Sequence, residues 1–334
     1  MLFYPSHDIA LANGLRHFNP PAMARHLQED LAYLAHIWNR PYRLGETATP
    51  IPWGWDYDTR QYIQKEYRIK PSLLPTDEDL ALLRHLSSRQ TTITINERLA
   101  QALPELQVSI PRLLTTEEAL TQYITRHDQE GKRFVLKTPW SSSGRGLTVS
   151  HTTDHEGQLR PTRRDTMTAH ALSTLRRMGG IMAEEWVTDK AQDFAMLFQA
   201  LGHRVGFIGY SLFDNDESLG GVTYRQGYLL GNEQIVERLG VDHSLLNKVA
   251  SHLEQVLTDL LRPLLGKPWP VGYLGVDMMT TRHGTVVPCV ELNLRTTMGV
   301  VCRLWHDEHQ QDGVFRISEM QDDGHFHAEF LTAK

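Results

Sequence analysis

The chain has 334 residues, of which 40% are hydrophobic and 22% charged, and its formal net charge is −6. This length accommodates two or three domains with buried cores, and the composition is ordinary for a soluble globular protein. The negative charge argues against a general nucleic-acid surface, which requires excess lysine and arginine. No apolar run is long enough to predict a membrane span.

The two cysteines, Cys289 and Cys302, are too few for a disulfide framework and lack the spacing of a metal-binding pair. The first residues do not combine a positively charged region with a long apolar stretch, which is the pattern of an export signal. We therefore expect a cytoplasmic location and neither export nor membrane insertion.

Residues 1–90 are predicted to form an N-terminal α/β domain. Apolar side chains recur every three or four residues from 22 to 38, which predicts an amphipathic helix. Thr76, followed by three acidic residues, indicates the start of another helix. The aromatic segment 50–57 could form a ligand platform, although burial is the commoner use of tryptophan.

Residues 91–130 are expected to form a connecting helical segment. Thr115 and Glu118 have the spacing of a capping box at the start of a helix. A small nucleotide-covering subdomain, residues 131–190, is expected to follow. Within it, residues 151–165 are polar and lack a clear period, which favours an exposed turn.

The most informative stretch is 134–149, in which an apolar run ends on Lys137 and continues through three serines and two glycines. The pattern predicts a strand, a polar loop and a second strand. The backbone N–H groups and hydroxyls of such a loop can converge on one anion, because glycine permits close approach. A phosphate beside Lys137 is the expected ligand, and an ordinary hairpin with a polar turn is the alternative.

Residues 191–334 are expected to form a C-terminal subdomain that binds metal and substrate. Alternating apolar residues at 194–198 and 205–210 predict an antiparallel pair of strands. The apolar stripe of 243–265 predicts a core helix.

Two segments between these elements are less regular. Residues 214–217 resemble the start of a calcium loop in composition, but the Gly and Glu that such a loop requires are missing, so a solvated turn is favoured. The glycine-containing segment 220–227 combines backbone freedom with a cation, which makes Arg225 a candidate substrate contact.

Candidate metal ligands lie on two strand-like segments. Alternation places Glu291, Asn293 and Arg295 on one face of the second segment. Asp277 lies near the end of the first, and the residues between them, 280–285, predict a hairpin that sets Asp277 beside Glu291. Carboxylate and amide oxygens suit Mg²⁺, and a neighbouring arginine suits the phosphate that Mg²⁺ carries.

Other kinds of site are disfavoured by the sequence. Among 17 histidines, His306 and His309 could share a helix face, but no HExxH motif or third ligand completes a transition-metal site. The sequence also lacks the Walker, Rossmann and GxSxG signatures.

Taken in order, these elements resemble the ATP-grasp superfamily over residues 90–305. The resemblance rests on the lysine at a strand end, the Ser/Gly loop, the acidic and aromatic segment 184–187, and the two strands that carry Asp277 and Glu291. It implies an α/β (α+β) ATP-grasp fold, with an N-terminal α/β domain and two antiparallel-sheet subdomains that grip the nucleotide. It also implies ATP and Mg²⁺ as cofactors, with Mn²⁺ as an alternative.

The resemblance further implies a role for each matching position. Nucleotide binding would use Arg98, Lys137, Ser141, Ser142, Ser143, Gly144, Arg145, Gly146, Glu184, Glu185, Trp186, Val187 and Asp193. Asp277, Glu291 and Asn293 would bind the metal, Lys137 and Arg295 would be catalytic, and Arg295 would also face the substrate. Two positions depart from the family pattern, because Arg98 and Glu185 stand where lysines are common.

In most ATP-grasp enzymes a carboxylate is phosphorylated and the acyl phosphate is then attacked by an amine or thiol. The resemblance therefore implies an ADP-forming carboxylate–amine ligase acting on an amino acid, a peptide or a similar small acid. A kinase-like phosphotransferase and a nucleotide-binding module without turnover are the alternatives. The expected partners are small-molecule acids and amines rather than nucleic acid or membrane, and a homodimer through the first domain is left open.

Overall fold

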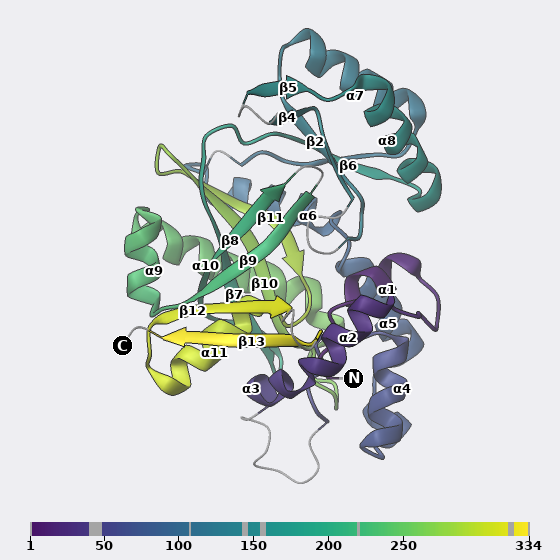
Figure 1. Ribbon diagram of the computed structural model, residues 1–334, viewed down its shortest axis with the longest axis vertical. Helices are drawn as coiled ribbons and strands as arrows, with labels where there is room; N and C mark the ends of the chain where they lie inside the picture. Colours follow the sequence, from purple (N-terminus) through teal and green to yellow (C-terminus); the bar gives the residue numbers. More distant parts are fainter. Residues whose placement is uncertain are drawn as a thin grey trace.

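The structure is a computed structural model that describes residues 2–39, 49–106, 108–141, 146–153, 158–218, 221–319 and 324–332. A small unit of sheet and helices stands above one end of a larger sheet, and the N-terminal helices lie beside the larger sheet (Figure 1). The mixture of helices with antiparallel sheets confirms the α/β (α+β) fold class expected from the sequence.

The small unit is built on a four-stranded antiparallel sheet in the order β1-β6-β2-β3. These strands are β1 (Arg112–Leu114), β2 (Phe134–Lys137), β3 (Leu147–Val149) and β6 (Ile181–Glu185). Helices α7 (Glu117–Gln129) and α8 (Arg164–Met178) pack on this sheet through a buried cluster that includes Leu120, Phe134 and Ala171. The strands predicted on either side of the Ser/Gly loop are therefore confirmed as β2 and β3.

Two details of the small unit differ from expectation. Helix α7 is capped by Thr116, whose side chain accepts a hydrogen bond from the Ala119 N–H, one residue later than the predicted cap. Part of the segment expected to be an exposed turn forms a two-stranded ribbon of β4 (His151–Thr153) and β5 (Leu159–Pro161).

The large sheet has seven antiparallel strands in the order β11-β10-β7-β8-β9-β12-β13. They are β7 (Lys190–Leu201), β8 (Arg204–Ser218), β9 (Gly221–Leu229), β10 (Gly272–Thr281), β11 (Val286–Asn293), β12 (Gly313–Glu319) and β13 (Phe326–Thr332). The predicted antiparallel pair is confirmed as β7 and β8. Residues 214–217 do not form the expected turn, because they continue β8 and pair with β9.

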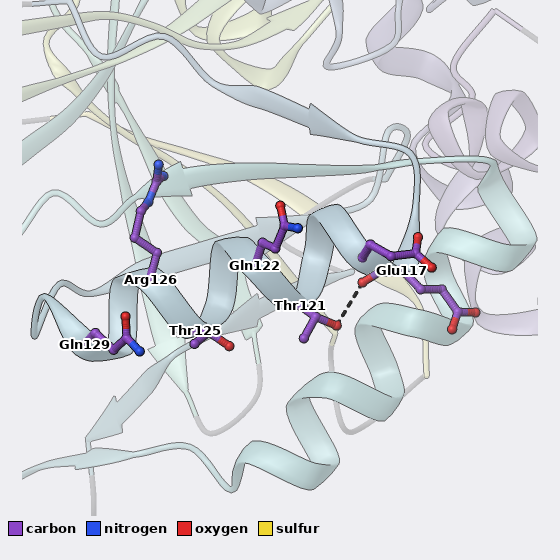
Figure 2. Close-up of a pocket in the computed structure, with 7 residues that line it drawn as sticks. Glu117, Thr121, Gln122, Thr125, Arg126 and Gln129 are labelled. Atoms are coloured by element: carbon purple, nitrogen blue, oxygen red, sulfur yellow. Dashed lines mark hydrogen bonds between the residues drawn. The ribbon is translucent and has the colours of Figure 1, made fainter.

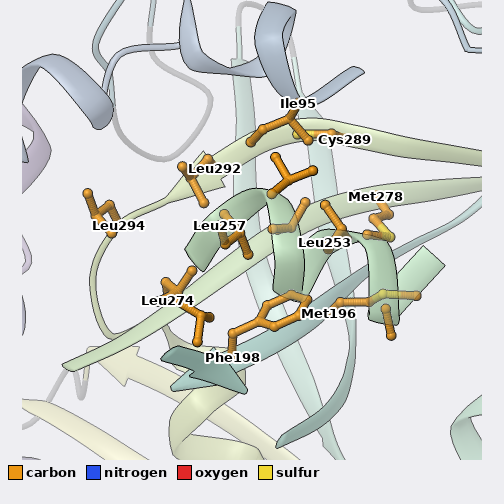
Figure 3. Packing of buried hydrophobic residues seen from close by; sticks show 14 of the residues in the cluster. Ile95, Met196, Phe198, Leu253, Leu257, Leu274, Met278, Cys289, Leu292 and Leu294 are labelled. Carbon is orange, nitrogen blue, oxygen red and sulfur yellow. The ribbon is translucent and has the colours of Figure 1, made fainter. Parts of the chain in front are cut away.

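Helices cover both faces of the large sheet. On one face lie α6 (Thr91–Ala102), α9 (Asn232–Leu239) and α10 (His243–Leu261). The buried stripe of α10, which includes Leu253 and Leu257, packs against Phe198 and Leu274 of the sheet (Figure 3). The predicted core helix is confirmed, but it ends at Leu261 and is followed by the 3-10 turn η4 (Arg262–Leu264), whose second residue, Pro263, lacks a backbone N–H.

The opposite face carries α11 (Met298–His309) and part of the N-terminal segment. Successive residues of β7 alternate between the two cores, because side chains along a strand point to opposite faces. Phe198 belongs to the first core and Leu197 to the second, where it joins Trp38, Trp53 and Val300. The N-terminal residues thus share the core of the large sheet, and Trp53 is used for packing, as the commoner interpretation held.

The described part of residues 1–90 is helical, and no strand is assigned in it, so the expected α/β character is not found there. Its elements are α1 (His7–Asn13), α2 (Ala22–Asp30), η1 (Ala32–Leu34), α3 (Ala35–Asn39), α4 (Tyr57–Glu66), η3 (Pro71–Leu73) and α5 (Asp77–Leu86). The helix predicted for 22–38 is interrupted by the 3-10 turn η1. Thr76 caps α5 as expected, in a reciprocal box with Asp79. Across the described ranges, no helix is both long and apolar enough to cross a lipid bilayer.

Candidate functional site

The candidate metal ligands lie on the hairpin of β10 and β11, at the edge of the large sheet. Asp277 stands directly opposite Glu291 in the register of the two strands. Asn293 lies on the same strand as Glu291, and its Nδ2 donates a hydrogen bond to Asp277 Oδ2 at 2.9 Å. The predicted hairpin is present, and it brings the three side chains together.

The electrostatics of this hairpin favour a cation. Burial, followed by the negative charge of Glu291, raises the pKa of Asp277 to about 7, while Arg295 and the hydrogen bond from Asn293 act in the opposite direction. A bound cation would relieve this repulsion between carboxylates. The available donors are carboxylate and amide oxygens, which fit Mg²⁺. Over the part of the chain that the structure describes, no group of three or more His, Cys, Asp or Glu could hold a metal ion, and the candidate set here combines two carboxylates with one amide.

Lys137 is the last residue of β2, where the apolar strand meets the loop. Its side chain is only 9% exposed, and its Nζ lies 2.5 Å from Glu184 Oε2 on the neighbouring strand β6. The other carboxylate oxygen of Glu184 is buried without a hydrogen-bond partner among the described residues. The end of β2 therefore places the buried ammonium group of Lys137 beside a carboxylate, that of Glu184, one oxygen of which has no hydrogen-bond donor among the described residues.

The two described ends of the Ser/Gly loop lie close together. The Thr138 N–H donates to the Gly146 carbonyl at 3.0 Å. Gly146 has a φ of 76°, and a Cβ there would lie 2.6 Å from Thr138 Oγ1, so a glycine is required at this position. Ser141 is described, whereas Ser142, Ser143, Gly144 and Arg145 lie outside the described residues.

The segment 184–187, which the resemblance implies binds the nucleotide, spans the end of β6. Glu185 is exposed and pairs with Lys132 at 3.2 Å, so its carboxylate points toward solvent. The Trp186 N–H donates to the Arg133 carbonyl at 2.9 Å, and Trp186 and Val187 are half-buried. This segment connects the small sheet to the large one.

Asp193 lies on β7, opposite Met279 of β10, and therefore beside the hairpin that carries the candidate metal ligands. Its carboxylate accepts hydrogen bonds from Lys190 Nζ and Asn215 Nδ2, each at 3.2 Å. Its charge contributes to the raised pKa of Asp277.

Arg295, just beyond β11, is held by the N-terminal helix α1. Its Nε lies 2.9 Å from both carboxylate oxygens of Asp8, its Nη2 lies 2.7 Å from Oδ2, and its Nη1 donates to the Thr296 carbonyl at 3.1 Å. Of the five N–H groups of an arginine, these contacts use three. One N–H on each terminal nitrogen is left to donate to a ligand.

Arg89 is a site residue that the sequence reasoning missed. It lies between α5 and α6 and is 5% exposed. Its Nη1 donates to the Thr138 carbonyl at 2.9 Å and to Ser141 Oγ at 2.7 Å, and its Nη2 lies 2.8 Å from Glu291 Oε1. No motif marks this position, and the only available signal was a cation in the turn before α6.

The charges that act on Cys289 come from residues of both sheets. Burial raises the pKa of the Cys289 thiol, and the charges of Asp277, Glu184 and Glu291 raise it further, whereas Lys137 acts in the opposite direction. The thiol on β11 thus lies within electrostatic range of residues from both sheets. The contacts of Arg89 with Thr138, Ser141 and Glu291 join the candidate nucleotide and metal residues in one charged region.

Two predicted residues are not brought to this region. Arg98 extends from α6 toward α10, where its Nη1 donates to Asp259 at 3.0 Å, and both side chains are exposed. Arg225 is exposed on β9, which β8, β7 and β10 separate from β11 in the sheet order.

A surface hollow lies elsewhere, along the outer face of α7 in the small unit (Figure 2). It is lined by Glu117, Glu118, Thr121, Gln122, Thr125, Arg126 and Gln129. None of these residues belongs to the charged region between the sheets, so this hollow does not mark the candidate site.

No protein-family model and no curated protein sequence matches this chain. Among solved structures, the ADP complex of N5-carboxyaminoimidazole ribonucleotide synthetase is 16% identical with a TM-score of 0.46, covering 89% of this chain and 69% of that one. Biotin carboxylase from Campylobacter jejuni is 12% identical with a TM-score of 0.46, covering 76% of this chain and 52% of that one. D-alanyl-alanine synthetase A from Vibrio cholerae O1 biovar eltor is 13% identical with a TM-score of 0.46, covering 78% and 73%.

This chain spans about half the length of the biotin carboxylase, at 52%. At these identities and TM-scores, the activity and substrates of the chain have to be inferred from its own residues.

Proposed function

We propose that this chain is an ADP-forming, Mg²⁺-dependent carboxylate–amine ligase of the ATP-grasp type. The observation that carries the proposal is the charged region between the sheets. There, Arg89 contacts Thr138 and Ser141, which follow Lys137 of the small sheet, and it also contacts Glu291 of the large sheet. A site that combines a buried ammonium group with paired carboxylates suits a nucleotide triphosphate and its divalent cation.

In this proposal, Asp277, Glu291 and Asn293 hold the metal ion. When bound, Mg²⁺ would neutralise the charge that develops on the β- and γ-phosphates. Lys137 donates to a phosphate oxygen, and the Ser/Gly loop, from Ser141 to Gly146, encloses the triphosphate with backbone N–H groups.

The end of β6, the segment that follows it and the start of β7 would bind the rest of the nucleotide. Glu184, Glu185, Trp186 and Val187 lie where the small sheet joins the large one, so their backbone can border the adenine ring. Asp193 lies on β7 beside the hairpin and would accept a hydrogen bond from the ribose.

Arg295 is proposed to bind the reacting group. The acceptor carboxylate attacks the γ-phosphorus, which forms an acyl phosphate and releases ADP. An amine then attacks the acyl carbon, so that an amide forms, and inorganic phosphate leaves with the electron pair of the broken C–O bond and takes up the proton that the amine nitrogen loses. The two N–H groups that Arg295 retains can hold the acyl phosphate in both steps.

The test is an assay with ATP, Mg²⁺ and pools of amino acids and small carboxylic acids, in which ADP, inorganic phosphate and products are measured separately. The proposal predicts phosphate release that requires both an acid and an amine. A phosphorylated product without phosphate release would indicate a kinase instead, and nucleotide binding without turnover would indicate a binding module. Glu291→Gln tests the metal assignment in the same assay, because loss of this carboxylate should remove the Mg²⁺-dependent turnover.

Mn²⁺ is expected to replace Mg²⁺ in this assay, because both ions accept oxygen ligands. The acid and amine are expected to be small molecules. A reducing cytoplasmic location is also expected, and it agrees with the two buried cysteines, which form no disulfide.

A further inference from the structure

Arg89 contacts both the loop of the small sheet and a candidate metal ligand of the large sheet. Its backbone N–H donates to the Pro139 carbonyl at 2.8 Å, so the main chain as well as the side chain is fixed to the start of the Ser/Gly loop. Its Nη1 holds Thr138 and Ser141 of the same loop. Its Nη2 lies between the two carboxylate oxygens of Glu291, at 2.8 and 2.9 Å. Arg89 therefore joins the loop of the small sheet to β11 of the large sheet.

The other cations of the site pair differently. Lys137 pairs with Glu184 inside the small sheet, and Arg295 pairs with Asp8 of α1. Within the described ranges, Arg89 is the cation that contacts both the loop and a candidate metal ligand. A metal ion that binds Glu291 must compete with it, because one guanidinium nitrogen lies against both oxygens of that carboxylate.

The guanidinium of Arg89 also has an unused donor. Its Nε is buried and has no hydrogen-bond partner among the described residues. A buried, unpaired N–H is unfavourable, and a charged one especially so. The Nε and Nη2 of an arginine point in the same direction and together fit two oxygens of one phosphate. The side chain could therefore release Glu291, keep its Nη1 contacts with the loop, and present Nε and Nη2 to a phosphate.

We propose that Arg89 is an internal counter-cation that occupies Glu291 in the nucleotide-free protein and exchanges this carboxylate for a phosphate oxygen when metal and nucleotide bind together. This inference rests on the proposed function, because it takes Glu291 as a metal ligand. The exchange makes metal binding depend on the nucleotide, since the metal gains Glu291 only when Arg89 gains a phosphate. The same arginine therefore opposes binding of the metal alone and favours binding of the metal–nucleotide complex.

The two effects have opposite signs, which gives a sharp test. Mn²⁺ is the probe, and electron paramagnetic resonance measures the free ion in the presence of the full-length protein, with and without a non-hydrolysable ATP analogue. Removing the competing charge in Arg89→Gln should tighten binding of Mn²⁺ alone by about tenfold. The same change should weaken binding of the Mn²⁺–analogue complex by about tenfold or more, because a phosphate contact is lost.

Two further variants separate the causes. Arg89→Lys keeps a positive charge beside Glu291 but loses the fork, so it should bind Mn²⁺ alone within about threefold of the wild type and bind the Mn²⁺–analogue complex more weakly. Arg176→Gln is the matched control, because it removes an exposed arginine from an ion pair with Glu117 on the small unit. Both affinities should then remain at the wild-type values. Arg89→Lys keeps the test usable if Arg89→Gln does not fold.

The outcomes distinguish this inference from the proposed function. If the wild type bound no Mn²⁺–analogue complex, or if Glu291→Gln bound it equally well, the proposed function would fail. If the wild type bound the complex through Glu291 but the Arg89 variants left the affinity for Mn²⁺ alone unchanged, or shifted both affinities in the same direction, Arg89 would not be a counter-cation. Opposite shifts in Arg89→Gln, with no shift in Arg176→Gln, would support the exchange.

Discussion

Replacing Asp8 with Asn tests whether the N-terminal helix is energetically part of the site. In the wild type, Nε and Nη2 of Arg295 lie 2.9 and 2.7 Å from the Asp8 carboxylate, and the two side chains are 15% and 17% exposed. Removing one partner of a buried ion pair costs about 3–5 kcal/mol. Because both groups retain some exposure, we expect Asp8→Asn to lower the free energy of unfolding by about 3 kcal/mol, at the lower end of that range.

Urea unfolding at pH 7, followed by tryptophan fluorescence, measures this loss. Asp77→Asn is the matched control, since Asp77 pairs with two arginines, Arg16 and Arg60, but is 42% exposed, and solvent screens such a pair. The account predicts a clearly lower midpoint for Asp8→Asn than for Asp77→Asn. Equal midpoints would refute the claim that α1 and β11 are coupled through this pair.

The same pair predicts a pH dependence. Burial alone would raise the pKa of Asp8, but the charge and hydrogen bonds of Arg295 outweigh burial and hold this pKa below its usual value. The carboxylate therefore stabilises the fold fully above the pKa of an unfolded aspartate, about 3.9, and this contribution is lost as the pH falls through the folded-state pKa. The stability difference between wild type and Asp8→Asn should shrink below about pH 4. A difference that stayed constant on acidification would contradict this assignment.

Three further substitutions test other parts of the account. Lys137→Met should lower the rate of ADP formation by about 10² to 10³, because one preorganised charged donor is lost, and an unchanged rate in a coupled assay would exclude Lys137 from the reaction. Gly146→Ala should introduce about 1–3 kcal/mol of strain, because φ is positive at this position. Calorimetry should therefore show weaker binding of an ATP analogue. Undiminished affinity would mean that the loop tolerates a Cβ there. Leu253→Ala, at a fully buried position of α10, should lower the free energy of unfolding by about 2–5 kcal/mol in urea titrations, and a loss below 1 kcal/mol would contradict the packing.

Local patterns were sufficient to predict the elements that form the site. Strand alternation and a polar turn predicted the hairpin that pairs Asp277 with Glu291, because side-chain direction along a strand has a fixed period of two. The apolar stripe of α10 predicted a helix for the same reason, with a period near four. The strands on both sides of the Ser/Gly loop followed from apolar runs that end at polar residues.

The contacts that complete the site could not be predicted in this way. Arg89 and Glu291 are 202 positions apart, and Arg295 and Asp8 are 287 apart. No periodicity links such residues, because their proximity depends on how the N-terminal helices pack against the large sheet. The prediction of Arg98 as a phosphate-binding cation relied on its position where the resembled family often has a lysine, whereas its helix directs it toward Asp259.

The prediction that the first ninety residues form an α/β domain was wrong for the described part, whose regular elements are all helices. It assumed that the apolar residues of this segment form a core of their own. Phe3, Trp38 and Trp53 instead complete a core built on the large sheet with Leu197 and Val300. Segments that pack on an existing sheet need no strands of their own, since the sheet already supplies an apolar face. The sequence of this segment alone therefore cannot show that its apolar residues pack on a sheet formed by residues much later in the chain.

The most direct test of the central claim is a crystal structure of the protein with Mg²⁺ and a non-hydrolysable ATP analogue. The account predicts the metal on the oxygens of Asp277, Glu291 and Asn293, with Lys137 on a phosphate oxygen of the same nucleotide. A nucleotide bound in the hollow along α7, or one bound between the sheets with its metal away from the β10–β11 hairpin, would contradict it.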